Sequence, residues 1–432
     1  MRDDRQQRGV RPAGALVALL LVAGACSGPG GTEVRSEAPR ASVPAGTVAR
    51  GSVPASSVTP GVTAIDGLAL DLYRRVAARP GNVLFSPYSV EVALAMTRNG
   101  AKGETREQMD AVLHAGRGAE LDEALNALDL ALAARPGHKG DEQRNGDVEL
   151  ALANALFGQK DTPFEAAFLD ELSRNYGAGM RVVDFKTSPE PARTEINDWV
   201  EDRTNDKIVD LLPNGSIDAL TRLVLTNAVY FKAPWTKKFQ PAGPKPFTRA
   251  DGSRVDAAAM STSKAGTYRE GPGWKAAEIP YLGGELAMDV IVPDDLAAFE
   301  SSLNSETLDT VLRGATEPLA TLQLPKFTFR SSIALKEQLA EMGMPLAFAD
   351  GADLSGITTA EQLRIRDVFH QAFIAVDEEG TEAAAATAVV IEAVSGPCCK
   401  SLVVDRPFLF AIRDVPTGVV LFLGRVADPT AS

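Results

Sequence analysis

Residues 369–399, FHQAFIAVDEEGTEAAAATAVVIEAVSGPCC, carry the strongest indication of the fold. The run 369–376 is apolar and rich in β-forming residues, which predicts a strand. Three acidic residues and Gly380 then interrupt it. Residues 381–394 are small and apolar, yet the acidic turn before them and Gly396 and Pro397 after them are typical of an exposed loop. The segment therefore has the composition of a buried strand, whereas the residues on either side of it are typical of an exposed loop.

The side chains after Gly380 alternate with a period of two. One face carries Thr381, Ala383, Ala385, Thr387, Val389 and Ile391, and the other carries Glu382, Ala384, Ala386, Ala388, Val390 and Glu392. A strand with one buried side has this pattern. Four consecutive alanines equally favour a helix, so composition alone leaves both structures open.

Residues 377–390, DEEGTEAAAATAVV, resemble the hinge of the reactive-centre loop of the serpin family. Three further segments resemble serpin elements in the same order: 82–90, NVLFSPYSV, the start of helix B; 225–235, LTNAVYFKAPW, strand 3 of sheet A; and 405–424, DRPFLFAIRDVPTGVVLFLG, the C-terminal hairpin. The resemblance implies an α+β fold with a large mixed sheet A, smaller sheets B and C, about eight or nine helices and an exposed loop.

The resemblance also assigns site residues. The hinge is expected at Glu379, Gly380, Thr381, Glu382, Ala383, Ala384, Ala385 and Ala386. A polar cluster beneath sheet A, called the shutter in this family, is expected at Ser86, Ser89, Asn227 and His370, and the breach at the top of the sheet at Trp235. Without the family, Ser86 and Asn227 are interpreted as caps of a helix and a turn, and His370 as an ordinary core histidine. Ser86 followed by Pro87 favours a helix start.

The family's usual register predicts the reactive bond. Gly380 and Thr381 are then the fifteenth and fourteenth residues before the scissile bond, which places Val394 on the acyl side and Ser395 on the leaving side. Ala393 and Ser395 are the neighbouring candidates for the acyl side. A valine suits a shallow apolar specificity pocket, and no basic residue lies between Gly380 and Cys399. We therefore expect elastase-like or subtilisin-like targets rather than trypsin-like ones.

The function implied is that of an inhibitory serpin, an irreversible suicide-substrate inhibitor of serine proteases. Loop cleavage, acyl-enzyme trapping and insertion into sheet A would produce a covalent complex between a monomeric inhibitor and its protease. A non-inhibitory serpin, acting as a binding or chaperone-like protein, is the alternative. A charged or bulky residue or a proline in the hinge would indicate it, and Thr381 and residues 383–386 contain neither.

The N-terminus has the pattern of an export signal. Four arginines precede an apolar run at 13–25, and VAGAC at 22–26 resembles a bacterial lipobox. Cys26 is the expected lipid anchor, with ordinary signal-peptide cleavage as the alternative. We expect a signal peptide at 1–25, a disordered Ser/Pro/Gly-rich tether at 26–62 and one domain at 63–432. The protein would be held on the outer face of the cell membrane or secreted.

Other functions find little support. The net charge of −13 and the absence of a basic stretch interleaved with aromatics argue against nucleic acid. Three histidines and no nucleophile elbow, Walker loop or zinc-protease helix predict no enzyme and no cofactor. The neighbours Cys398 and Cys399 are too few for a metal site. In an oxidising compartment they can form a vicinal disulfide or capture another thiol.

Overall fold

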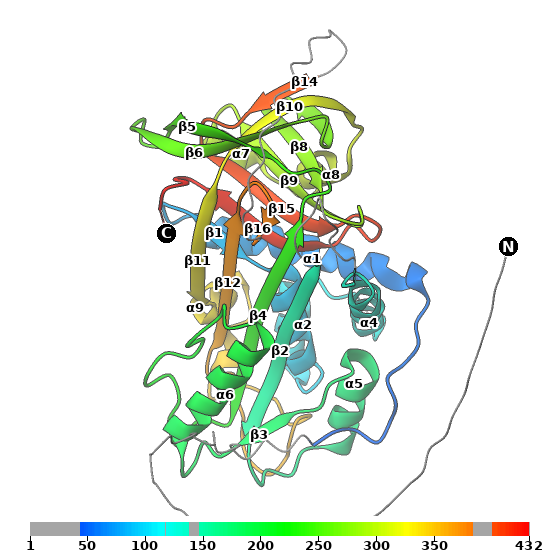
Figure 1. Cartoon of the computed structure of the whole chain (residues 1–432). Coiled ribbons are helices and arrows are strands. Elements are labelled where there is room, and N and C mark those ends of the chain that lie inside the picture. Colours follow the sequence, from blue (N-terminus) through cyan, green and yellow to red (C-terminus); the bar gives the residue numbers. More distant parts are fainter. Residues whose placement is uncertain (1–43, 117, 138–146, 383–399, 432) are drawn as a thin grey trace, which may run out of the picture. The chain divides into compact units, whose positions relative to one another are not determined.

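The computed structural model describes residues 44–116, 118–137, 147–382 and 400–431. All of them belong to one compact unit, Ala41–Ser432. Within these residues the helices are α1 (Thr59–Val76), α2 (Pro87–Arg98), α3 (Gly103–Val112), α4 (Glu120–Ala133), α5 (Ala166–Tyr176), α6 (Pro189–Arg203), α7 (Leu296–Ser302), α8 (Ser305–Arg313) and α9 (Lys336–Met342), with short 3-10 turns η1 (Ala55–Val58) and η2 (Pro345–Phe348). Figure 1 shows their arrangement.

A six-stranded mixed sheet holds the longest strands. Its order is β11 (Phe327–Ala334), β12 (Val368–Val376), β13 (Gly380–Thr381), β4 (Leu223–Pro234), β2 (Glu149–Gln159) and β3 (Arg181–Val183). The neighbours β11–β12 and β2–β4 are antiparallel, whereas the central pair β4–β12 is parallel and sets His370 opposite Asn227. The large central sheet expected from the sequence is present.

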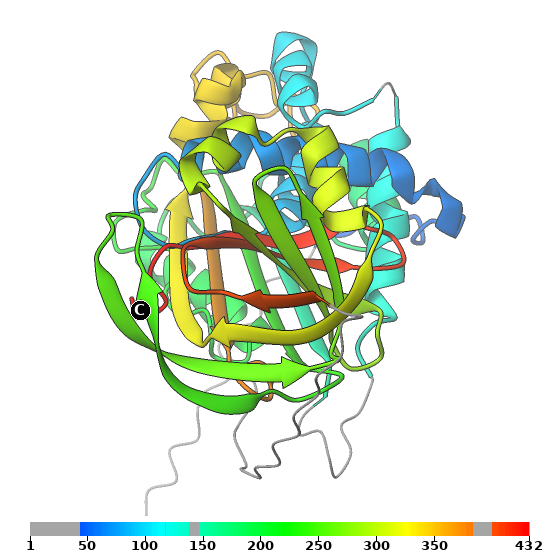
Figure 2. The same ribbon diagram turned by 90° about the horizontal axis from the view of Figure 1, so that it is seen from above.

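The other strands form one ten-stranded network. The path runs β1 (Val83–Phe85), β16 (Val420–Val426), β15 (Phe408–Asp414), β9 (Leu286–Pro293), β8 (Trp274–Pro280), β7 (Thr267–Gly271), β10 (Glu317–Pro325), β6 (Arg254–Ser263) and β5 (Gln240–Thr248), with β14 (Lys400–Val403) paired to β10. The sequence predicted two smaller sheets, B and C, and in the structure they are joined through β10. Seen from above, the β5–β6 hairpin lies away from helices α7 and α8 (Figure 2).

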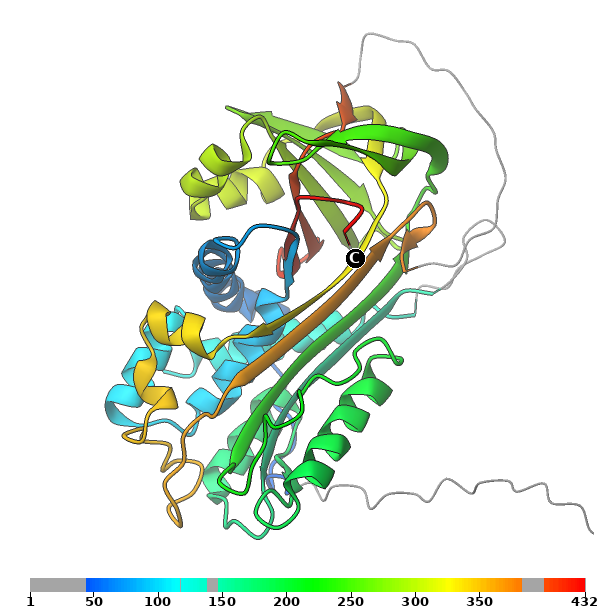
Figure 3. The ribbon, with the colours of Figure 1, turned by 90° about the vertical axis from the view of Figure 1, so that its left-hand side faces the viewer.

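Helices cover both faces of the six-stranded sheet. In side view, α6 lies against one face and α2 against the other (Figure 3). Ala153 of β2 and Ala228 of β4 are paired, and both are buried with Val200 of α6. These small side chains let α6 approach the strands closely, because a larger side chain on a pleated surface would hold the helix away.

Helix α2 begins where the sequence predicts. Ser86 is its N-cap, and its hydroxyl accepts a hydrogen bond from the backbone N–H of Ser89 at 3.2 Å. Pro87 occupies the first turn, where its missing N–H costs nothing. Every residue of α2 is buried, since the helix lies between the six-stranded sheet and other helices.

Part of the stretch expected to be a tether, 26–62, is folded against the domain. Helix α1 already begins at Thr59, and residues 44–58 contact α4 and α5. The backbone N–H of Gly46 donates to Ser173 Oγ at 2.8 Å, and Arg50 donates to Asn126 Oδ1 at 2.9 Å. A stretch too polar to form its own core can still satisfy its backbone on a preformed surface, which composition does not show. Residues 26–43 lie outside the described part.

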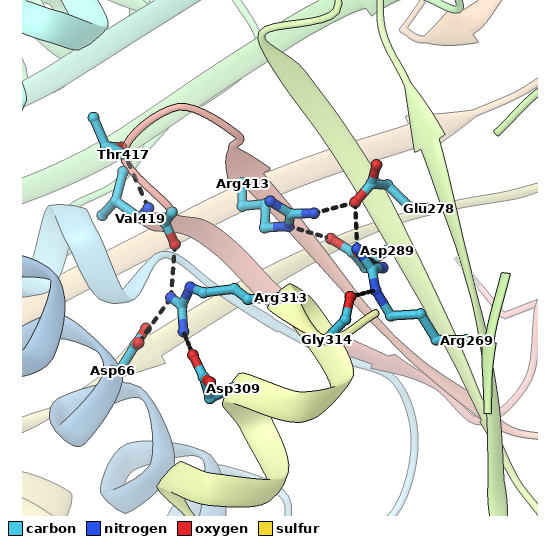
Figure 4. A network of polar contacts seen from close by, with 11 residues as sticks. Asp66, Arg269, Glu278, Asp289, Asp309, Arg313, Gly314, Arg413, Thr417 and Val419 are labelled. Carbon is cyan, nitrogen blue, oxygen red and sulfur yellow. Dashed lines mark hydrogen bonds and ion pairs between the residues drawn. The ribbon is translucent and has the colours of Figure 1, made fainter. Parts of the chain in front are cut away.

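A buried ion cluster ties α8 to the ten-stranded sheet (Figure 4). Asp289 accepts hydrogen bonds from Arg269 at 3.0 Å and from Arg413 at 2.7 Å, and both arginines also contact Glu278. Arg269 further donates to the carbonyl of Gly314 just after α8 at 3.1 Å. Two cations and two anions thus balance in a region from which water is largely excluded.

Candidate functional site

The upper part of the six-stranded sheet is split between β4 and β12. The two strands pair directly only from Val368↔Leu225 to Ala372↔Val229. Above that, β13 lies between them, with Thr381 opposite Ala233 of β4 on one side and Val376 of β12 on the other. Two residues of the predicted hinge therefore already occupy the start of a strand position in the sheet.

Thr381 and Gly380 fit this position closely. Thr381 is only 1% exposed, and its hydroxyl lies 2.6 Å from the hydroxyl of Tyr281, which is also buried. A Cβ on Gly380 would lie 2.1 Å from the carbonyl oxygen of Ala233, so a side chain there would force the strands apart. The hinge can enter only with a glycine at this point.

The chain leaves the sheet at Glu382. Its backbone is in the left-handed region, with φ of 54°, and its N–H donates to Ala375 O at 2.7 Å. Its carboxylate forms an ion pair with Lys207, from the segment that follows α6. The side chains of Thr381 and Glu382 therefore have different partners, Tyr281 for Thr381 and Lys207 after α6 for Glu382.

The acidic turn before β13 is held on the sheet by several contacts. The indole N–H of Trp235 donates to Asp377 O at 2.9 Å, and its backbone N–H donates to Glu379 O at 2.9 Å. Glu379 forms an ion pair with Lys238 at 2.5 Å, and Glu378 forms one with Lys326 at 3.3 Å. Burial raises the pKa of Asp377. The turn is therefore fixed on both sides of the split.

A polar cluster lies beneath the parallel part of the sheet. The backbone N–H of Ser86 donates to His370 Nε2 at 3.0 Å, and His370 Nδ1 contacts Asn227 Oδ1. Asn227 and Ser89 both donate to Asn154 Oδ1, at 3.2 and 2.5 Å. The structure thus brings together all four residues expected at the shutter, and adds Asn154.

His370 is neutral in this cluster. Complete burial lowers its pKa from 6.5 to about 4, since no charged partner compensates for the lost hydration. Nε2 accepts a hydrogen bond, so the hydrogen-bond pattern assigns the ring proton to Nδ1, which donates to Asn227. Because His370 is neutral, its hydrogen bonds to Ser86 and Asn227 can break and re-form without moving a charge in the core.

Sequence reasoning missed three contributors to the site. Asn154 interrupts an otherwise apolar strand, ELALANALFGQ, and this interruption was a usable signal. Tyr281 and Lys207 have no local signal. Tyr281 simply follows the end of β8, and Lys207 lies in a polar segment after α6. Only the three-dimensional arrangement brings them to the hinge.

Comparison with known proteins identifies the fold. A family model described as serpin (serine protease inhibitor) matches residues 63–429. The chain belongs to the serpin family. A serpin-like protein of Thermococcus kodakarensis is 38% identical over 379 residues, covering 85% of each chain. The leukocyte elastase inhibitor of Bos taurus is 36% identical over 384 residues, covering 84% of this chain and 97% of the inhibitor. The native-state crystal structure of tengpin, a thermophilic serpin, superposes with a TM-score of 0.77 at 27% identity, covering 90% of this chain and 100% of tengpin.

In serpin terms, the six-stranded sheet is sheet A, and β13 holds Gly380 and Thr381 of the predicted hinge. Trp235, assigned to the breach, is fully buried and stacks on Tyr281 with ring centroids 4.5 Å apart. Ala383–386, the reactive bond Val394–Ser395, Cys26, Cys398 and Cys399 lie outside the described residues, so those assignments stay predictions.

None of the helices within the described residues is both long and apolar enough to cross a membrane. The same part of the chain holds no group of three or more His, Cys, Asp or Glu side chains placed to bind a metal ion.

Proposed function

We propose that this serpin inhibits serine proteases by cleavage and insertion of its reactive-centre loop. The protease serine attacks the carbonyl carbon of Val394, the bond to Ser395 breaks, and the new amine leaves with the C-terminal segment. The loop remains joined to the protease as an ester. Its free N-terminal part then enters sheet A, a mode of strand addition for which serpins are an established example. The trapped protease is carried along before water can hydrolyse the ester.

The split above the β4–β12 pair is the observation that carries this proposal. Thr381 already occupies the first position of a new strand, and Glu382 marks where the chain turns out of the sheet. Insertion would extend β13 downward between β4 and β12, and the new strand would pair with both of them. About ten added backbone hydrogen bonds, at a net ~0.5–1.5 kcal/mol each, would stabilise the inserted state.

The composition of the loop also supports its insertion into sheet A. Residues 383–391, AAAATAVVI, have small, mostly apolar side chains that can enter between neighbouring strands, whose usual spacing is about 4.8 Å, and none of them is charged. Burial of Val389 and Ile391 would add ~1.5–3 kcal/mol each. The loop-out form would then persist because its conversion is slow, and not because it is the most stable state.

The predicted target class rests on Val394. A shallow apolar pocket accepts valine, whereas a trypsin-like pocket requires a basic residue. The relationship to a bovine protein named leukocyte elastase inhibitor supports an elastase-like target. Sequencing the C-terminal peptide released from a denatured complex tests the bond: it should begin at Ser395, and a start beyond Gly396 or before Ala393 contradicts the register.

Incubation with pancreatic elastase followed by denaturing electrophoresis tests the proposed function. We expect a band that survives boiling and has the summed mass of protease and inhibitor, less the released C-terminal peptide. A nicked chain without this band, over a panel that includes a subtilisin, would indicate the alternative of a serpin that serves as a binding or chaperone-like protein.

We also propose that diacylglycerol on Cys26 anchors the protein at the outer face of the cell membrane. The lipobox-like VAGAC at 22–26 and the polar stretch after it support this location. Membrane fractions should contain the wild-type protein, and Cys26→Ser should release it. A mature N-terminus at another residue, found by mass spectrometry, would instead make the protein a secreted one.

A further inference from the structure

Tyr281 lies directly behind the hinge and is held rigidly. It follows β8 and is completely buried, with the ring of Trp235 stacked on it at 4.5 Å and the ring of Phe231 edge-on at 5.0 Å. Its carbonyl accepts a hydrogen bond from the hydroxyl of Thr236 at 2.7 Å, and its N–H donates to Leu286 O at 2.9 Å. These contacts fix the position of the phenol oxygen.

That oxygen has one polar contact among the described residues, the hydroxyl of Thr381 at 2.6 Å. Both groups are buried and both can donate or accept, so each satisfies the other. The bond joins the residue that follows β8 to the second residue of β13. The phenol oxygen makes no such hydrogen bond to the turn at 377–379 or to Glu382.

We propose that Tyr281 is a positioning residue for loop insertion, whose hydroxyl holds Thr381 in the register from which the strand extends. This role rests on the proposed inhibitory function and specifies how insertion begins. Register matters because a shift by one residue exchanges the two faces of a strand. It would turn Glu382 to the buried side, where no cation compensates for its charge, and Thr381 to the α6 side.

The hydrogen bond between Tyr281 and Thr381 affects whether the loop inserts before the acyl-enzyme ester is hydrolysed. With Thr381 held, the start of the strand exists before cleavage, so the freed loop only has to extend it. Without the phenol oxygen, the hydroxyl of Thr381 is buried with its partner removed, and the two-residue strand opens more often. More acyl-enzyme is then hydrolysed before the loop inserts, and the protein is consumed as a substrate.

The test uses Tyr281→Phe, which removes only the hydroxyl, and two measurements. Hydrogen exchange reports on the intact protein at the amides of Asp377 and Glu382, which donate to Gly380 O and Ala375 O. We expect both to exchange about five- to tenfold faster, as the loss of one buried hydrogen bond implies. The number of inhibitor molecules consumed per elastase molecule inhibited equals one plus the ratio of hydrolysis to insertion. Its excess over one should rise by a similar factor, while the rate of loop cleavage stays unchanged.

A double-mutant cycle separates positioning from general destabilisation. Thr381→Val keeps the shape without the hydroxyl and should match Tyr281→Phe, the double variant should add nothing further, and Thr381→Ser should behave as wild type. Tyr73→Phe is the control, because Tyr73 of α1 is also buried and its hydroxyl donates to Glu300 of α7 at 2.6 Å, and neither helix contributes a residue to the hinge or the shutter cluster. It should alter neither measurement.

The outcomes distinguish the two proposals. Unchanged exchange at Asp377 and Glu382 in Tyr281→Phe, or additive effects in the double variant, overturns the positioning role whether or not complexes form. Faster exchange in the absence of any covalent complex with the wild-type protein supports the positioning contact and overturns the inhibitory function.

Discussion

At the scale of single residues, His370 shows how one neutral side chain can hold the sheet closed. It joins helix α2 to strands β12 and β4 through Ser86 and Asn227. From its neighbours in sequence alone, His370 is an ordinary core histidine, and Ser86 and Asn227 are caps. Ser86 does cap α2, but its N–H also binds His370, so the two interpretations are compatible. The resemblance placed these residues together, and local pattern could not.

The depressed pKa of His370 predicts a loss of stability in acid. In the unfolded chain the imidazole titrates near 6.5, and in the folded chain near 4. The folded state therefore binds fewer protons between these values, so its stability is fully present above pH 6.5 and falls as the pH drops to about 4. The difference corresponds to roughly 3 kcal/mol.

The measurement is the denaturant midpoint of unfolding for wild type and His370→Gln, from about pH 4 to about pH 7.5. This range covers the folded and the unfolded pKa of His370. The difference between the two proteins isolates this residue from other titrating groups. Wild type should lose its advantage over the variant as the pH falls. A difference that stays constant with pH would contradict the neutral assignment.

Thr381→Arg should convert the inhibitor into a substrate. Thr381 is buried against Tyr281, and a guanidinium there would lose its hydration without gaining a carboxylate, at a cost of several kcal/mol (~3–5). Insertion would then be slower than hydrolysis of the ester. Elastase should cleave the variant without forming the boiling-resistant complex, whereas Glu382→Arg, on the α6 side, should retain more of it. Equal complex formation by wild type and Thr381→Arg would remove Thr381 from the inserting face.

At the scale of elements, sequence pattern predicted individual elements but not how they are tied together. Strand β12 and the start of helix α2 lie where the sequence pattern indicated. The start of α1 was missed because Pro60 lies in a polar stretch that resembles a linker. Residues 44–58 were missed for a related reason, since their contacts are made by backbone groups and a few polar side chains. Tyr281 could not be found, because its partner is 100 residues away in the chain.

The buried ion cluster under α8 gives a prediction at this scale. Asp289→Asn removes an anion and leaves Arg269 and Arg413 with a single carboxylate in a buried region. We expect the free energy of unfolding to fall by about 3–5 kcal/mol. The matched control, Asp309→Asn, removes a carboxylate that is 67% exposed and pairs with Arg313 at 3.2 Å on the same helix. It should cost ~0.5 kcal/mol or less.

Denaturant unfolding of the two variants measures this contrast (Figure 4). A loss in Asp289→Asn no larger than that in Asp309→Asn would mean that water or backbone groups compensate for the missing charge. The cluster would then not be the tie between α8 and the sheet.

At the scale of the whole molecule, the account requires that the native fold is not the most stable one. The upper half of sheet A is paired to only two residues of the loop, and the lower half is closed by direct pairing of β4 with β12. Full insertion must break that lower pairing and replace it with two new rows of backbone hydrogen bonds. The shutter cluster contacts both strands of the lower pairing, so in the proposed mechanism it would set the barrier between the two states. The family resemblance indicated such a transition, and the geometry of β13 supplies its starting point.

Cleavage of the loop is therefore expected to stabilise the protein. A cut between residues 389 and 396 frees the N-terminal part of the loop to join sheet A, and the hydrogen bonds gained, ~10 in number, exceed those lost between β4 and β12. Scanning calorimetry of the intact and the nicked protein measures this directly. The account predicts that the nicked form unfolds at a temperature higher by on the order of tens of degrees. Equal transition temperatures would show that the loop does not enter the sheet and would contradict the inhibitory mechanism.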